Sequence, residues 1–176
     1  MPACALLSLG SNLGSRWHHL SAAVSALARE DPALACSSVY ETAPIGGPAA
    51  QGRYLNVVVS LTTDRTPDGL LDLAHELEAT AGRVRQERWG ARTLDVDLLW
   101  FEGVVSKRPE LTLPHPRCGM RAFVLVPLAE LTGRTPPVPP IDADLLVELA
   151  GAKWRDRLRD DIDGVRRAGV LLGSAA

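Results

Sequence analysis

The sequence predicts an α+β fold in which helices pack against an antiparallel sheet. Short apolar runs bounded by glycine, proline and asparagine alternate with segments whose apolar residues recur every three or four positions. These runs and segments follow one another as strand, helix, strand, strand, helix, strand. Of the 176 residues, 46% are hydrophobic and 23% are charged, which is the ordinary balance of one globular domain.

The first half of the chain supplies three strands and one helix. Residues 3–9 are an apolar run that ends in a Gly-Ser-Asn turn, as expected of a buried strand. Residues 15–29 carry apolar side chains at spacings of four and three, which predicts an amphipathic helix. Residues 34–42 and 54–62 are predicted as the second and third strands, and the proline- and glycine-containing segment 44–53 as a long loop between them.

The second helix and the fourth strand follow. Thr66 and Pro67 combine an N-cap with proline at the first helical position, and Gly82 marks the end of this helix. Residues 83–92 are polar and arginine-rich and are predicted as a loop. Residues 93–101 are predicted as the fourth strand.

The remainder of the chain is less regular. We expect residues 104–105 to form the return strand of a hairpin, and residues 121–129 to be a strand that turns into a helix at Pro127. Residues 133–140 are a proline-rich connector, which favours extended backbone. Residues 141–176 are predicted as a helical C-terminal extension with a frayed tail.

The β-α-β-β-α-β order is that of the split βαβ unit, the ferredoxin-like plait. Such an order predicts an antiparallel sheet with helices packed against it. We therefore expect a single domain over residues 1–176, with its core at about residues 3–130.

Composition excludes several classes of protein. The formal net charge is −2 and the pI is about 6.1, so no global positive field favours nonspecific binding to nucleic acid. No apolar run is long enough for a transmembrane helix, and the N-terminus lacks the features of a signal peptide. The three widely spaced cysteines suit reduced thiols better than a disulfide framework or a zinc site. We expect a cytoplasmic protein that binds neither nucleic acid nor a membrane.

Two carboxylates in the fourth predicted strand indicate chemistry. Because side chains alternate along a strand, Asp95 and Asp97 share one face, and Leu94, Val96 and Leu98 lie on the other. Two carboxylates about 7 Å apart repel each other unless a cation lies between them. Mg²⁺ is commonly held by one or two carboxylates together with substrate phosphates. A pair of solvated aspartates on an exposed strand face is the alternative.

Four arginines lie within one stretch of ten residues, 83–92, shortly before this pair: Arg83, Arg85, Arg88 and Arg92. Guanidinium groups beside a metal-binding carboxylate pair suit phosphoryl-type transfer, because they take up developing negative charge. A solvated basic loop is the alternative. Trp89 lies inside this polar segment, where an exposed indole is costly unless it closes over a ligand.

Further candidate ligands lie elsewhere in the chain. His115, flanked by two prolines, is suited to donate a hydrogen bond to phosphate or to act as a general acid, and a surface histidine fixed by the turn is the alternative. Arg121 is suited to bind phosphate. Tyr54 and Asn56 share one face of the third strand, and an asparagine amide offers both a donor and an acceptor to a planar amidine-type edge. Tyr54 and Phe123 are able to sandwich a flat heterocycle, although core packing is the simpler interpretation of both rings.

Seven segments occur in a fixed order over about residues 3–130. They are Leu-Gly-Ser-Asn-Leu-Gly at 9–14, Tyr-Glu-Thr-Ala-Pro at 40–44, Tyr-Leu-Asn at 54–56, Gly-Arg-Val-Arg at 82–85, Arg-Trp-Gly-Ala-Arg-Thr-Leu-Asp-Val-Asp at 88–97, Leu-Pro-His-Pro at 113–116 and Arg-Ala-Phe-Val-Leu-Val-Pro-Leu at 121–128. Together they resemble the 6-hydroxymethyl-7,8-dihydropterin pyrophosphokinase family of folate biosynthesis, and the segment 88–97 is the most specific of them.

The resemblance implies a ferredoxin-like α+β fold and transfer of the β,γ-diphosphate of ATP to the pterin hydroxymethyl group, with release of AMP. It implies that Asp95 and Asp97 hold two Mg²⁺ ions and that Arg83 and Arg92 are catalytic groups that neutralise the diphosphate. The implied pterin-binding residues are Thr42, Ala43, Pro44, Ile45, Tyr54, Asn56 and Phe123. The implied ATP-binding residues are Glu78, Arg85, Arg88, Trp89, Leu98, Thr112, His115 and Arg121.

Several points stay open on the sequence alone. The resemblance gives no role to His75, to Glu110 or to the C-terminal tail, and we expect a monomer. Two alternatives remain. One is an Mg²⁺-dependent phosphohydrolase that uses Asp95 and Asp97, and the other is a non-enzymatic nucleotide-binding module of the same fold. We also expect the two long loops to be mobile without ligand and ordered when both substrates are bound.

Overall fold

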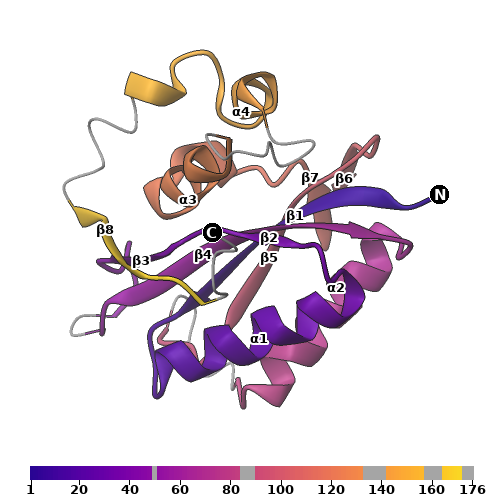
Figure 1. Ribbon diagram of the computed structural model, residues 1–176. Helices are drawn as coiled ribbons and strands as arrows, with labels where there is room; N and C mark the ends of the chain where they lie inside the picture. The colour runs from indigo at the N-terminus through magenta and orange to yellow at the C-terminus, as the bar shows by residue number, and fades with distance from the viewer. Residues whose placement is uncertain (49–50, 84–89, 133–141, 157–163, 172–176) are drawn as a thin grey trace.

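A computed structural model of the chain describes residues 1–48, 51–83, 90–132, 142–156 and 164–171. An antiparallel sheet forms its centre, and helices cover both faces (Figure 1). The strands are β1 (Ala3–Ser11), β2 (Ala35–Cys36), β3 (Val39–Thr42), β4 (Tyr54–Thr63), β5 (Asp95–Phe101), β6 (Ser106–Arg108), β7 (Leu111–Leu113) and β8 (Arg166–Gly169). The main sheet has the order β5-β1-β4-β3-β8, β2 also pairs with β4, and β6 and β7 form a separate pair.

The register of the sheet brings distant polar residues together. β1 pairs antiparallel with β4 on one side and with β5 on the other. Gly10 is the partner of Asn56 in the first pair and of Asp95 in the second. Asn56, Gly10 and Asp95 therefore lie side by side on three adjacent strands, and Ser8 and Asp97 pair one step further along β1.

Two helices lie on each face of the sheet. α1 (Arg16–Glu30) and α2 (Pro67–Thr80) cover one face, and α3 (Ala122–Thr132) and α4 (Ala143–Ala150) cover the other (Figure 1). A short 3-10 helix, η1 (Cys118–Met120), leads into α3. The predicted start of α2 is confirmed, because the Thr66 hydroxyl accepts a hydrogen bond from the Gly69 amide at 3.1 Å.

The alternation of side chains along β1 divides the core into two clusters. Leu7 and Leu9 pack on the α1–α2 side, whereas Leu6 packs with Val58 and Leu99 on the α3–α4 side. Burial of these side chains drives the docking of both helical layers. Along the second face, the apolar residues give way at one end of the sheet to serine, glycine, asparagine and aspartate. That end is the only described part of this face where β1, β4 and β5 all present small or polar side chains.

The predicted strand at 34–42 is wrong as one continuous element. Ser37 and Ser38 separate β2 from β3. The Ser37 hydroxyl accepts a hydrogen bond from the Val58 amide at 3.0 Å, and the Ser38 hydroxyl donates to Glu130 at 3.1 Å. These side-chain bonds replace part of the backbone ladder, which interrupts the strand.

Two further predictions are wrong. Residues 104–105 form no return strand, because β6 begins at Ser106 and pairs with β7 instead of β5. Residues 121–129 contain no strand, because α3 is helical from Ala122 onward with Pro127 inside it. Val124, Leu125 and Leu128 are buried in the second core cluster, and this packing outweighs the hydrogen bond that Pro127 cannot donate.

The prediction that residues 141–176 form a helical extension with a frayed tail is wrong in part, because this segment also contains a strand. It holds α4, a helical turn at 154–156 and a strand, β8, which includes Gly169. Leu171 packs against the first core cluster. The connector at 133–140 and the end of the tail at 172–176 lie outside the described residues.

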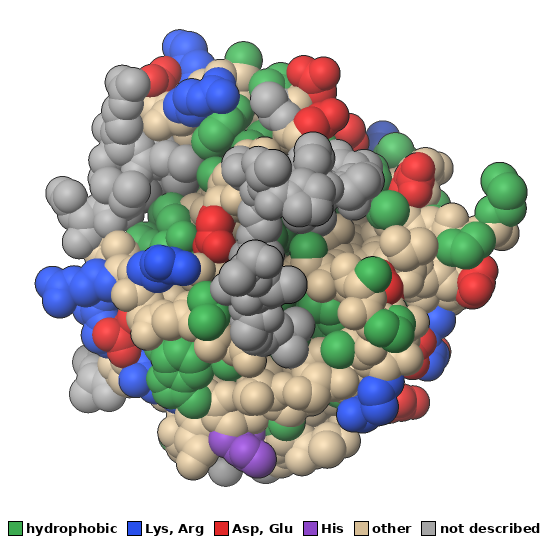
Figure 2. Space-filling model, in the orientation of Figure 1, with side chains coloured by type: hydrophobic (Ala, Val, Ile, Leu, Met, Phe, Trp, Pro, Cys, Tyr) green, Lys and Arg blue, Asp and Glu red, His purple; other side chains and the backbone are tan. Residues whose placement is uncertain are grey.

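The surface carries charges of both signs, and the cysteines are thiols. None of the helices in the described ranges is long and apolar enough to cross a membrane. Figure 2 shows acidic and basic side chains interspersed over one face of the molecule. Burial raises the pKa of Cys118 to about 11, so this thiol is protonated and unreactive at neutral pH.

Candidate active site

Two cavities meet at the polar end of the sheet. The larger, of about 1010 Å³, extends from α2 past the edge strand β5 to the β6–β7 pair. The smaller, of about 340 Å³, lies between the loop that follows β3 and the η1–α3 segment. Arg92, Asp95 and Asp97 line both cavities. A group that moves from one cavity to the other therefore passes these three side chains.

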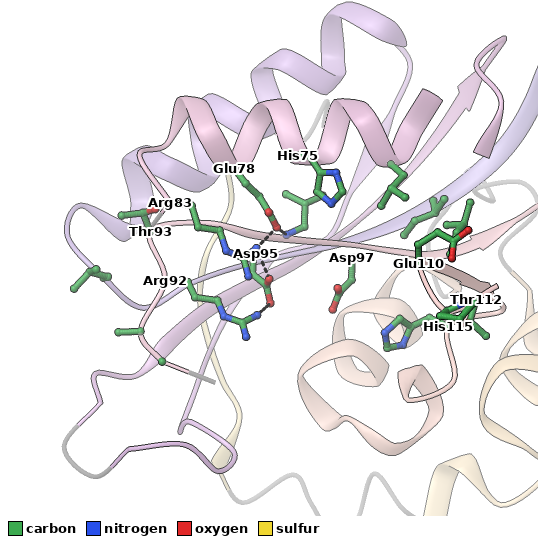
Figure 3. Close-up of a pocket in the computed structure, with 18 of the residues that line it drawn as sticks. His75, Glu78, Arg83, Arg92, Thr93, Asp95, Asp97, Glu110, Thr112 and His115 are labelled. Atoms are coloured by element: carbon green, nitrogen blue, oxygen red, sulfur yellow. Dashed lines mark hydrogen bonds and ion pairs between the residues drawn. The ribbon is translucent and has the colours of Figure 1, made fainter. Parts of the chain in front are cut away.

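Asp95 is held between two guanidinium groups. Its Oδ1 lies 2.8 Å from Arg83 Nη1 and its Oδ2 lies 2.5 Å from Arg92 Nη1. Figure 3 shows both arginines on one side of Asp95, with Asp97 and His115 on the other side. Although burial disfavours its charge, the neighbouring Asp95 carboxylate raises the pKa of Arg92 above its ordinary value. Both arginines are thus fixed cations at the junction.

Glu78 orients the Arg83 side chain toward Asp95. The Glu78 side chain comes from the last turns of α2 and is only 5% exposed. Its Oε1 accepts a hydrogen bond from the Val96 amide at 2.9 Å and forms an ion pair with Arg83 (Figure 3). One buried carboxylate thus fastens α2 to the outer edge of β5 and directs Arg83 toward Asp95.

Asp97 pairs with a third guanidinium. Asp97 Oδ2 lies 3.1 Å from Arg121 Nη1, and the Arg121 guanidinium lies over the Phe123 ring at 5.4 Å from its centroid. This geometry is that of a cation–π contact. Each of the three carboxylates Glu78, Asp95 and Asp97 therefore has an arginine partner, and these arginines are positioned for anionic phosphates as well.

His115 lies in the larger cavity as a neutral hydrogen-bond donor. Its backbone amide donates to the Leu99 carbonyl at 2.8 Å, which fixes this segment beside β5. Its Nδ1 accepts a hydrogen bond from the Arg117 amide at 3.2 Å, so the proton of the neutral ring is on Nε2. Burial lowers the pKa of His115 below its ordinary value despite the nearby Asp97 charge.

The smaller cavity combines aromatic rings with one buried amide. Asn56 is 2% exposed, and its Nδ2 donates to Thr42 Oγ1 at 2.9 Å. Gly10 leaves space beside it, since a Cβ at Gly10 would lie 3.1 Å from Asn56 Oδ1 and 3.6 Å from Tyr54 Cδ1. Burial raises the pKa of Tyr54, so its phenol is uncharged. Together with Phe123, these groups form a site for a flat, uncharged ring.

Asn12 connects the walls of the two cavities. Its Oδ1 accepts a hydrogen bond from the Arg92 amide at 2.7 Å, and its Nδ2 donates to Gln51 Oε1 at 3.2 Å and to the Gly52 carbonyl at 3.3 Å. The amides of Asn12 and Leu13 in turn donate to the Arg92 carbonyl. The turn after β1 thus positions Arg92.

Most of the predicted site residues line the two cavities. All seven predicted pterin-binding residues line the smaller one, together with Arg121. Glu78, Leu98, Thr112 and His115 line the larger one, as do His75 and Glu110. Arg85, Arg88 and Trp89 lie outside the described residues, so their predicted contacts and the expected mobility of the two loops remain predictions.

Sequence reasoning missed six residues that line the smaller cavity: Ser8, Gly10, Gly46, Gln51, Arg117 and Met120. The alternation of β1 could have identified the first two, because Ser8 and Gly10 are small residues inside an otherwise apolar run. No local pattern marks the other four, which reach the cavity only through the arrangement of the loops.

The donor set at the junction fits magnesium. Within the described ranges, no group of three or more histidine, cysteine, aspartate or glutamate side chains is arranged to hold a metal ion. Asp95 and Asp97 supply two carboxylates, and Mg²⁺ is usually bound by one or two carboxylates with substrate phosphates completing its shell. These residues therefore suit a metal that arrives with a nucleotide.

Comparison with known proteins agrees with this geometry. A model of the 7,8-dihydro-6-hydroxymethylpterin-pyrophosphokinase family matches residues 6–133. A 2-amino-4-hydroxy-6-hydroxymethyldihydropteridine pyrophosphokinase of Mycobacterium leprae is 41% identical over 179 residues, which cover 95% of this chain and 87% of the relative. The enzyme of the same name from Bacillus subtilis is 41% identical over 129 residues, which cover 72% of this chain and 77% of the relative.

Solved structures share the fold. The crystal structure of wild-type Plasmodium falciparum HPPK-DHPS superimposes with a TM-score of 0.56 at 12% identity. The match covers 95% of this chain but 48% of the other, so the chain spans about half the length of that protein. From the family match and the relatives, the chain belongs to the 7,8-dihydro-6-hydroxymethylpterin-pyrophosphokinase family, the enzymes of folate biosynthesis that transfer diphosphate from ATP to 6-hydroxymethyl-7,8-dihydropterin.

Proposed function

We propose that the larger cavity binds ATP, that the smaller cavity binds the pterin, and that the diphosphate crosses between them at Asp95 and Asp97. One observation carries this proposal: Arg92, Asp95 and Asp97 line both cavities. A transfer reaction requires donor and acceptor to meet in a fixed orientation, and a shared wall of charged groups supplies that geometry.

The edge of β5 suits the base of the nucleotide. The Val96 amide points away from β1, because Glu78 accepts its hydrogen bond from the outer side. Leu98 follows two residues later in the same regular register, so its amide and carbonyl also point outward, into the larger cavity. This backbone edge offers a donor and an acceptor to a purine. Thr112 and His115 lie further along the same cavity and are suited to the phosphates.

Arg85, Arg88 and Trp89 complete the proposed ATP site on the strength of the resemblance alone. Arg121 is proposed to hold phosphate at the boundary of the two cavities, because its guanidinium already pairs with Asp97 there.

The smaller cavity suits the pterin. Tyr54 and Phe123 supply ring faces, and Asn56 presents its amide at the base of the cavity. The segment 42–45 lies along one wall and offers backbone groups to the edge of the heterocycle. An asparagine amide and backbone groups together match the donor–acceptor edge of a pterin.

Charge neutralisation is the main contribution of the protein to catalysis. Two magnesium ions held by Asp95 and Asp97 would supply positive charge to the phosphates and orient the acceptor hydroxyl. Arg83 and Arg92 face the same point and neutralise the diphosphate during transfer. Phosphoryl-type transfer needs positioning and electrostatic stabilisation rather than a covalent nucleophile.

The proposal also covers the fold topology, the number of domains, the oligomeric state and the location of the protein. The order β5-β1-β4-β3, with every neighbouring pair antiparallel, supports a ferredoxin-like plait over a core at about residues 3–130. We propose a single domain over residues 1–176 and a cytoplasmic monomer that binds neither nucleic acid nor a membrane. The interspersed surface charge and the presence of cysteines as thiols support this assignment.

The test is to incubate the protein with ATP, MgCl₂ and 6-hydroxymethyl-7,8-dihydropterin and to separate the products. We expect AMP that forms only when the pterin is present, in amounts equal to the pterin diphosphate. ADP would indicate ordinary kinase chemistry, and AMP with free pyrophosphate in the absence of pterin would indicate a hydrolase. ATP binding without turnover would indicate a binding module. Each of these three results contradicts the proposal.

A further inference from the structure

β8 lies beyond the part of the chain that the family model matches. The match ends at residue 133, whereas β8 spans Arg166–Gly169. The sequence Arg-Arg-Ala-Gly has few strand-forming residues, and the first three residues of the strand are exposed. Neither strand propensity nor burial explains why this segment pairs with the sheet.

β8 gives β3 its second neighbour. β3 pairs with β4 through Tyr40, Glu41 and Thr42 only. On its other edge, Tyr40 is the partner of Arg167 and Glu41 is the partner of Arg166. Without β8, β3 would be a short edge strand with one row of unpaired backbone groups. Figure 1 shows β8 alongside β3 at the rim of the sheet.

Three side-chain contacts hold the end of the chain in this position. Arg167 Nε donates to Ser38 Oγ at 2.8 Å, and Arg53 Nη2 donates to the Gly164 carbonyl at 3.0 Å. Trp17 of α1 lies directly on Gly169, where an added Cβ would lie 2.9 Å from the indole ring. The backbone φ of 154° at Gly169 also disfavours any other residue.

The same contacts lead to the smaller cavity. Arg53, besides reaching Gly164, places its Nε 3.4 Å from Glu41 Oε2. Glu41 precedes Thr42, which lines the smaller cavity and accepts the hydrogen bond that orients the Asn56 amide. Arg53 directly precedes Tyr54, the first residue of β4. The loop that forms one wall of the cavity is thus held at both ends: β8 pairs with β3, which precedes the loop, and Gly164, just before β8, accepts a hydrogen bond from Arg53 at the end of the loop.

We propose that β8, together with Gly164 just before it, is a positioning element of the acceptor cavity: β8 pairs with β3, Gly164 accepts a hydrogen bond from Arg53, and these contacts fix Thr42 and the adjoining wall and thereby set the affinity for the pterin. This inference rests on the proposed function of the smaller cavity. The larger cavity has no contact with β8 in the described part of the chain, so the affinity for ATP is independent of it.

The test uses the full chain with two substitutions. Gly169→Val places a branched side chain against Trp17 and displaces β8. Arg53→Ala removes the link to Gly164 from an exposed position, where loss of folding is not expected. We expect each variant to raise the KM for 6-hydroxymethyl-7,8-dihydropterin by about fivefold or more, as expected for loss of one or two hydrogen bonds. The KM for ATP should change by less than about twofold, since no ATP contact is altered.

Arg65→Ala is the matched control. Its side chain is 40% exposed and paired with Glu30, whereas that of Arg53 is 42% exposed and paired with Glu41. We expect Arg65→Ala to leave both KM values unchanged. Unchanged pterin KM in both variants, or an equal rise of the two KM values, would overturn the inference. If the unsubstituted protein forms no pterin diphosphate at all, the proposed function fails instead, so the two failures are distinguishable.

Discussion

The two cavities of this protein differ in the side chains that line them. The larger one extends along the edge of β5, and its lining includes charged side chains from α2, β5 and the segment before β5. The smaller one lies on a sheet face and is lined by aromatic rings, a buried amide and small residues. Arg92, Asp95 and Asp97 belong to both. The sheet edge therefore offers charge that suits a polyanion, whereas the sheet face offers a shape that suits a flat neutral ring, as the proposed function requires.

A substitution at the shared wall gives the largest expected effect. Asp97→Ala removes one of the two carboxylates at the junction, and we expect kcat to fall by about 10³-fold or more. Metal charge stabilisation is worth several kcal/mol, and each 1.36 kcal/mol corresponds to about tenfold in rate. The measurement is steady-state turnover across a range of MgCl₂ concentrations. Asp68→Ala is the control, since Asp68 pairs with Arg108 and lines neither cavity. Near-normal turnover of Asp97→Ala would contradict the metal assignment.

A substitution in the smaller cavity should separate the two ligands. Phe123→Ala removes one ring face, and we expect the KM for the pterin to rise by about 10-fold to 100-fold, because stacking of a base on an aromatic ring is worth about 1–3 kcal/mol. The affinity for ATP, measured by calorimetry, should stay the same. Tyr54→Phe retains the opposite ring and serves as the control. A similar loss of ATP affinity in Phe123→Ala would show that the two cavities do not act separately.

The smallest expected effect is on the pH dependence of the free energy of unfolding, through His115 in the larger cavity. The pKa of His115 in the folded protein lies below its ordinary value of 6.5, and burial is the main cause. The unfolded chain therefore binds this proton first as the pH falls, and the free energy of unfolding decreases below about pH 6.5. Above that pH the contribution is constant. His115→Gln should remove this part of the pH dependence, which urea unfolding between pH 5 and pH 8 would measure. Equal slopes in the two proteins would exclude His115 as the titrating group.

Local patterns predicted much of the sheet and the catalytic strand. The period-two alternation placed Asp95 and Asp97 on one face, and Leu94, Val96 and Leu98 are buried on the other, as predicted. The family resemblance supplied the candidate pterin- and ATP-binding residues, and those within the described ranges line the two cavities. Patterns failed at 121–129, where strand-like residues form α3 because the helix buries them against the sheet.

Sequence patterns did not predict which side chains contact one another. Nothing in the sequence indicates that Glu78 directs Arg83 to Asp95, because this contact depends on how the end of α2 docks against the edge of β5. Nothing indicates that Asn12 holds Arg92 either, because these two residues are 80 positions apart. The strand at Arg166–Gly169 is the clearest case, since its composition favours a solvated tail.

Local sequence specifies which residues alternate, which carry charge and which segments begin or end a helix. Those properties depend on backbone sterics and on neighbours a few positions apart, which a linear pattern records. The position of Arg92, Asp95 and Asp97 between two cavities, and the pairing of β8 with β3, follow only from the folded chain. Strand register and long-range burial decide such contacts, because the free energy of each depends on a partner that the local sequence does not specify.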